Sequence, residues 1–101
     1  MTTTTDSFEP NYGSGVTVAP SGTSGSTTLG SNLENIVLTN LSSSVTVFVR
    51  VGKGAQTATT NDYPVLPSAQ VSLSKAQYAN TVAYITGGST GSLHIIAGKG
   101  L

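Results

Sequence analysis

Short runs of alternating side chains, each ended by a turn-forming cluster, fill the chain from Leu33 to its C-terminus. Within residues 45–51 every second side chain is valine, with Thr46, Phe48 and Arg50 between them. Because successive side chains of a β-strand point to opposite faces, this spacing predicts strands with one buried face. The Gly, Ser, Asn and Pro residues between the runs predict tight turns.

Six or seven short strands of this kind are expected, because the runs recur with turn signals between them. Residues 35–41 and 45–51 form the first predicted hairpin, and residues 81–86 and 92–98 form the last. Between these hairpins, residues 63–67 contain two prolines, which suit an edge strand or a bend. The pattern predicts an all-β fold, a small antiparallel β-sandwich or barrel of Greek-key or jelly-roll type.

The first third of the chain has a different composition, with the low-complexity stretches TTTT and SGTSGSTTLGS and few large apolar side chains. Such a stretch buries too little to offset the entropy lost on ordering. We therefore expect an extended arm over residues 1–32 and a β-sandwich domain over residues 33–101. The segment GVTVAP in the arm suits addition as an edge strand to a partner or a neighbouring copy. The candidate partner-binding residues of the arm are Phe8, Pro10, Tyr12, Val16 and Val18.

Few charges are present: 8% of the residues, with 4 Lys and Arg balancing 4 Asp and Glu. Nucleic acids and anionic membranes are recognised by clustered basic side chains, which this sequence lacks, so neither is expected as a partner. The absence of cysteine excludes disulfides and thiolate sites. No basic and apolar leader opens the chain, and no apolar run is long enough to span a membrane, which predicts a protein that is neither secreted nor membrane-embedded.

Ionisable groups for catalysis are scarce in the predicted domain, which offers Glu34, Asp62 and His94. General acid–base catalysis needs paired groups in different environments, and no G-x-S-x-G elbow accompanies the serines. His94 falls within a predicted strand, on its outward face. The acids, which include Asp6 and Glu9, are too scattered for a metal site. We expect no enzymatic activity, no metal and no cofactor.

A small core and a nearly uncharged surface predict self-association, as a dimer or a trimer. A carbohydrate-binding module is an alternative of another class, because tyrosines stack on sugar rings. Against it, Tyr84 lies in an apolar run and is expected in the core. No two tyrosines have the spacing on one strand that builds a flat aromatic face.

Residues 35–73 and 81–101 resemble small virion proteins of tailed bacteriophages that are encoded among the head genes. The shared features are F-V-R-x-G, then A-T-x-x-D-Y-P-V-x-P, and a closing T-G-x-x-T-G-x-L-x-I with a terminal G-x-G. The resemblance implies a decoration or cement protein, made in the host cytoplasm, that braces major capsid subunits on the outer surface of the capsid. A neck, tail or fibre-head component is the alternative within phage structure.

Arg50 and Asp62 both fall within these features. An arginine near a strand end often clamps a loop carboxylate, so a structural ion pair is expected, with two separate surface charges as the alternative.

Overall fold

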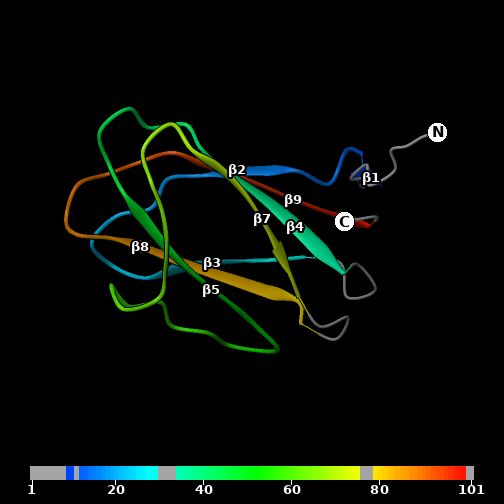
Figure 1. Cartoon of the computed structure of the whole chain (residues 1–101). Coiled ribbons are helices and arrows are strands. Elements are labelled where there is room, and N and C mark those ends of the chain that lie inside the picture. Colours follow the sequence, from blue (N-terminus) through cyan, green and yellow to red (C-terminus); the bar gives the residue numbers. More distant parts are fainter. Residues whose placement is uncertain (1–8, 11, 30–33, 76–78, 100–101) are drawn as a thin grey trace.

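The computed structural model of the chain describes residues 9–10, 12–29, 34–75 and 79–99. Within them lie strands and no helix, so the all-β prediction is confirmed and none of the described segments is a helix that could cross a membrane. Two antiparallel sheets pack face to face as a β-sandwich (Figure 1). The strands are β1 (Glu9–Pro10), β2 (Val16–Val18), β3 (Gly25–Thr28), β4 (Asn35–Asn40), β5 (Val47–Gly52), β6 (Tyr63–Val65), β7 (Gln70–Ser74), β8 (Thr81–Thr86) and β9 (Leu93–Lys99).

The strand order identifies the sandwich as a jelly roll. Sheet A has the order β1–β9–β4–β7, with β2 also paired to β9, and sheet B has the order β3–β8–β5–β6. The antiparallel pairs β2–β9, β3–β8, β4–β7 and β5–β6 are those of one long two-stranded ribbon folded over itself. The pairs β4–β9 and β5–β8 complete the two sheets.

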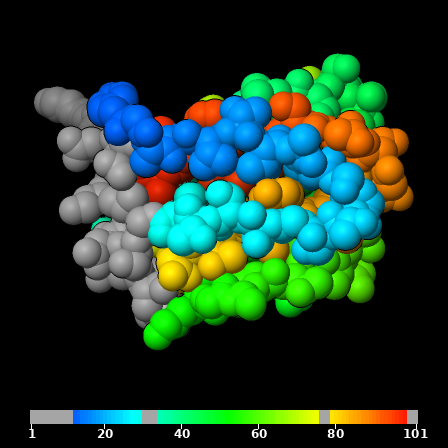
Figure 2. Space-filling model, turned by 180° about the vertical axis from the view of Figure 1, so that it is seen from behind, coloured from blue at the N-terminus to red at the C-terminus, as the bar shows by residue number. Residues whose placement is uncertain are grey.

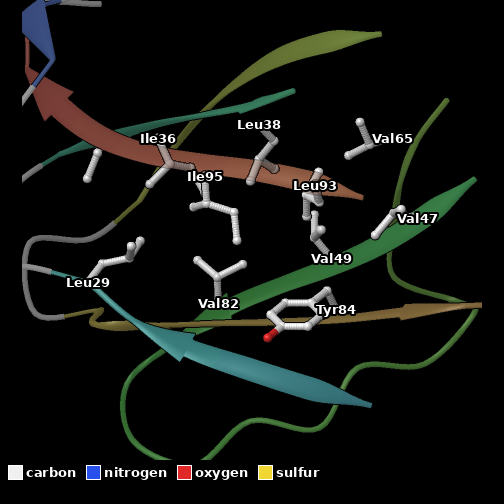
Figure 3. Close-up of a cluster of buried hydrophobic side chains, with 11 residues drawn as sticks. Leu29, Ile36, Leu38, Val47, Val49, Val65, Val82, Tyr84, Leu93 and Ile95 are labelled. Carbon is white, nitrogen blue, oxygen red and sulfur yellow. The ribbon is translucent and has the colours of Figure 1, made fainter. Parts of the chain in front are cut away.

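Alternate residues of both sheets meet in the core, as the two-residue period predicts. On β5, Val47 and Val49 are buried, whereas Arg50 is exposed. Leu38 and Ile95, on neighbouring strands of sheet A, are inaccessible to solvent. Figure 3 shows these side chains filling the space between the sheets. The whole cluster is Leu29, Ile36, Leu38, Val47, Val49, Val65, Val82, Tyr84, Leu93, Ile95 and Ala97.

The described part of the N-terminal segment belongs to both sheets, whereas an extended arm was expected over residues 1–32. β1 and β2 add to β9 at the edge of sheet A, and β3 adds to β8 at the edge of sheet B. Residues 12–29 run along one side of the sandwich, blue and then cyan in Figure 2. Edge strands are held largely by backbone hydrogen bonds, which few large side chains need to accompany. For this reason composition alone does not reveal them.

Candidate functional site at the loop end

Four connections between strands gather at one end of the sandwich, which we call the loop end. They are residues 19–24, 41–46, 66–69 and 87–92. Each crosses from one sheet to the other, and the ribbon topology of a jelly roll brings these crossings to the same end, at the left and upper left of Figure 1. None of the four contains Asp, Glu, Lys, Arg or His. The loop end therefore carries no formal charge.

The charged residues that the structure describes lie toward the opposite end of the strands. Glu34 precedes β4, Lys53 follows β5 and Lys75 follows β7, each at the strand end remote from the loop end. Glu9 and Lys99 are register partners of β1 and β9 at that same remote end. A partner covering the loop end would meet hydroxyl groups, backbone and apolar side chains. No ionised group would lose its hydration there, which removes a large cost of binding.

Hydrogen bonds between the loops hold the loop end together, with Ser42 at the centre. The Ser42 hydroxyl accepts from the N–H of Ser92 at 2.8 Å, and the Ser42 carbonyl accepts from the N–H of Ser68 at 2.9 Å. The carbonyl of Pro20 accepts from the N–H of Gly91 at 2.8 Å. Each loop is thereby bonded to at least one other loop. A surface fixed in this way loses little conformational entropy on binding.

Asn40, the last residue of β4, anchors the same end from inside the sandwich. Its side chain is buried, with 1% of the residue exposed. The amide Nδ2 donates to the carbonyls of Val45 at 2.7 Å and Val65 at 3.0 Å, and Oδ1 accepts from the N–H of Ser42 at 2.9 Å. These bonds connect β4 of sheet A to the loop before β5 and to the end of β6 in sheet B. A buried amide whose groups are bonded in this way fixes one arrangement of the loops.

Two leucines project from this frame into solvent. Leu41 is 56% exposed and Leu66 is 59% exposed. They follow directly on Asn40 and Val65, which the side-chain hydrogen bond joins, so the two leucines stand on adjacent loops. A single exposed leucine is ordinary, but the loop end exposes two, on adjacent loops.

A shallow hollow of about 280 Å³ lies beside these loops. Gly88 at its rim has φ +145°, a conformation that favours glycine. Gly22 of the neighbouring loop passes so close that a Cβ on it would lie 3.2 Å from the Gly88 Cα. The hollow offers hydroxyls and one aromatic ring to an uncharged group. Its lining is Ser44, Val45, Thr46, Phe48, Gly87, Gly88 and Ser89.

Sequence reasoning does not single out Leu41, Ser42 or Leu66 as site residues, because their segments have the composition of ordinary turns. The available signal is that all four loops lack charge. This signal gains meaning only when the strand order brings the loops to one end.

Arg50 and Asp62 form the predicted ion pair, on the outer side of sheet B. Arg50 Nη2 lies 3.0 Å from Asp62 Oδ1, and Arg50 Nε donates to the same oxygen at 3.0 Å. Asp62 Oδ2 accepts from the N–H of Thr59 at 2.7 Å. The pair fastens the loop between β5 and β6 to β5, so its role is structural.

Stability should depend on the ionisation of Asp62. The N–H of Thr59 and the guanidinium of Arg50 hold the pKa of Asp62 below its usual value of 3.8. A carboxylate with a lowered folded pKa adds stability above its unfolded pKa, and that stability is lost as pH falls through the folded pKa. The native chain should therefore be more stable than Asp62→Asn at neutral pH, and the difference should shrink below pH 3.8. Urea unfolding across this pH range measures it; a pH-independent difference contradicts the expectation.

The five arm residues predicted to bind a partner are placed in other ways. Phe8 lies outside the described residues, Pro10 is in β1, and Tyr12 is 82% exposed between β1 and β2. Val16 and Val18 are half-buried and pair with β9, and Val18 packs against the core. The edge-strand addition predicted for this segment therefore occurs within the chain. Both valines remain partly exposed, and their contact with a partner stays a prediction.

His94 lies on the outer face of sheet A, as predicted, with Thr17 of β2 and Thr39 of β4 as its register neighbours. Its ring rests on Gly15, where a Cβ would come within 2.8 Å of Nε2. Across the described ranges, no three His, Asp or Glu side chains come together as a metal-binding group.

Tyr84 is a core residue, as predicted, and is 9% exposed. Its hydroxyl donates to the carbonyl of Ser26 at 3.3 Å, and burial raises the pKa of Tyr84. Tyr12 and Tyr63 are exposed, but Tyr12 lies in the turn between β1 and β2 of sheet A, whereas Tyr63 begins β6 at the edge of sheet B. Tyr78 lies outside the described residues. The described tyrosines therefore build no shared platform for a sugar ring.

No protein-family model matches the chain, and no curated protein matches it. Among solved structures, the crystal structure of PirA is similar over 84% of this chain and 93% of that chain, with 14% sequence identity and a TM-score of 0.49.

Proposed function

We propose that the chain is a non-enzymatic virion structural protein, a decoration or cement protein that binds major capsid subunits on the outer capsid surface and associates with copies of itself. The loop end is the observation that carries this proposal, because it is fixed, uncharged and exposes Leu41 and Leu66. Such a surface binds through shape and apolar contact. A capsid lattice repeats the contact by symmetry, so that individually weak contacts add up to stable attachment.

The resemblance to head-associated virion proteins supplies the class of partner. Its closing motif, T-G-x-x-T-G-x-L-x-I, spans residues 86–95 and contains one whole loop of the loop end. The motifs F-V-R-x-G and A-T-x-x-D-Y-P-V-x-P supply Arg50 and Asp62, which contact each other. The residues that carry the resemblance thus form one loop of the loop end and the ion pair that fastens the loop between β5 and β6. These are parts that a static lattice protein needs.

Attachment is tested by replacing the two exposed leucines of the loop end. The double variant Leu41→Ser/Leu66→Ser should bind expanded capsids at least about tenfold more weakly, because covering a leucine contributes about 1.5–3 kcal/mol and tenfold corresponds to about 1.4 kcal/mol. Co-sedimentation with expanded capsids measures the affinity. Both leucines are largely exposed in the free chain, so the unfolding midpoint should stay unchanged.

Tyr12→Ser is the matched control, because it removes an exposed large side chain outside the loop end. Capsid binding should survive it. If Tyr12→Ser or deletion of residues 1–8 abolishes binding while the double leucine variant binds normally, attachment lies in the N-terminal residues and the loop-end proposal is wrong. If the native chain ignores capsids and binds isolated necks or tails, the decoration role is wrong.

A further inference from the structure

β7 forms the longest unguarded edge of either sheet among the described residues. It has five residues, whereas the other edge strands, β1, β2, β3 and β6, have two to four. Its sequence, QVSLS, contains no proline and no charged residue, which are two common devices against edge pairing. An uncovered edge of this length is a template for one more strand.

The hydrogen bonds of the β4–β7 ladder show which backbone groups of β7 point outward. The N–H of Asn40 donates to the carbonyl of Ala69 at 2.9 Å, so these two residues form a bonded pair. Bonded pairs alternate along an antiparallel ladder. The N–H and C=O groups of Gln70, Ser72 and Ser74 therefore point away from β4. No strand of the described chain pairs with β7 on that side.

The other edge strands are shorter than β7, and two of them carry a proline that prevents pairing. By the same alternation, Pro10 of β1 and Pro64 of β6 occupy outward positions, where a missing N–H prevents pairing. β2 offers a single outward residue, Thr17. The start of β3 is covered by the loop between β5 and β6, whose Ala58 N–H donates to Ser24 Oγ at 2.8 Å. Among these edges, β7 alone presents three outward residues and has neither a proline nor a charge.

We propose that two copies of the chain pair their β7 strands antiparallel across a two-fold axis, which joins the two A sheets into one. Ser72 then faces Ser72 of the partner subunit, and Gln70 faces Ser74 of the partner subunit. In this register all the outward groups of both strands are bonded, through about six backbone hydrogen bonds. A shift by two residues leaves some of these groups without partners.

The side chains of β7 match this register. On the inner side, Val71 meets Leu73 of the partner subunit, and both types of residue are only half-buried against the core of the single chain. Pairing covers this apolar surface. On the outer side, hydroxyl and amide groups meet and no like charges are opposed. Sheet B is not extended in the same way, because Pro64 blocks the outward position of β6.

This inference gives a surface to the self-association in the proposed function and rests on that part of it. The β7 edge and the loop end are different surfaces, so the two can fail separately. Dimerisation is measured on the purified full chain without capsids, whereas loop-end attachment is measured with them.

A charge swap at the two-fold axis tests the register. Ser72→Asp and Ser72→Lys each place like charges directly opposite one another, so each should raise the dimer Kd at least about tenfold. An equimolar mixture should dimerise again, because aspartate then faces lysine. Sedimentation velocity should give the native chain twice its 10.2 kDa mass. Ser26→Asp, the same change on an edge strand of sheet B, should dimerise like the native chain.

Ser72→Pro is the second variant. It gives β7 an outward proline like those of β1 and β6. The N–H that it removes is not bonded to β4. The variant should be a monomer with the native circular dichroism spectrum. A native chain that stays monomeric across the concentration series overturns the inference. So does a trimer, since isologous edge pairing closes at two copies. Aspartate and lysine variants that dimerise as the native chain does also overturn it.

Discussion

Asn40→Asp should lower the free energy of unfolding by about 3 kcal/mol or more. The amide Nδ2 of Asn40 donates to the carbonyls of Val45 and Val65, and a carboxylate would turn an oxygen toward both of them. Two buried acceptors would lose their donor, and a charge would be buried without a cation beside it. At about 4–8 °C per kcal/mol for a domain of this size, thermal unfolding followed by circular dichroism should show a Tm lower by at least about 12 °C.

Asn61→Asp is the control, because it makes the same chemical change at an exposed position of the loop between β5 and β6. Its effect should stay within about 0.5 kcal/mol. Asn40→Ala should fall between the two, since it removes the donors without adding a charge. If Asn40→Asp is no less stable than Asn61→Asp, the buried amide does not hold the loop end in place.

Local patterns in the sequence predicted those features of the fold that depend on residues adjacent in the sequence. The valines of residues 45–51 indicated a strand with one buried face, and β5 buries Val47 and Val49. The prolines of residues 63–67 indicated an edge or a bend, and β6 is the edge strand of sheet B. In each case the determining signal lies within a few residues, where side-chain alternation and backbone restriction act directly.

The loop end could not be predicted in this way, because contacts distant in the sequence create it. Asn40 and Val65 are 25 residues apart, and their hydrogen bond places Leu41 and Leu66 on adjacent loops. The turn-rich stretches containing Ser42 and Ser92 carry no sign that they meet. Their proximity follows from the folding of the ribbon into a jelly roll, which fixes the strand order.

For the N-terminal segment, the composition indicated less structure than the chain has. A chain poor in large apolar residues cannot build a core, but it can complete one that other strands supply. Val18 does this from the edge of sheet A, where β2 pairs with β9 beside Leu93 and Ile95. Residues 12–29 therefore have to be counted within the folded unit.

Deletion of residues 1–20 should lower the free energy of unfolding by about 3 kcal/mol or more, from the half-buried Val16 and Val18 and the buried Pro20. It removes β1 and β2 together, which exposes β9 with the core residue Ile95 on a new sheet edge. It also removes the Pro20 carbonyl that accepts from Gly91 at the loop end. Urea unfolding of the truncated and native chains measures the loss.

Deletion of residues 1–8 is the control that separates the two parts of the N-terminal segment. It keeps β1 and β2 and should change stability by no more than about 0.5 kcal/mol. Because the contribution of β2 comes from pairing with β9 and from covering the core, the large loss should appear only when residues 16–18 are removed. A chain without residues 1–20 that unfolds at the native urea concentration would show that β2 adds nothing to the sandwich, and the segment would then be an arm after all.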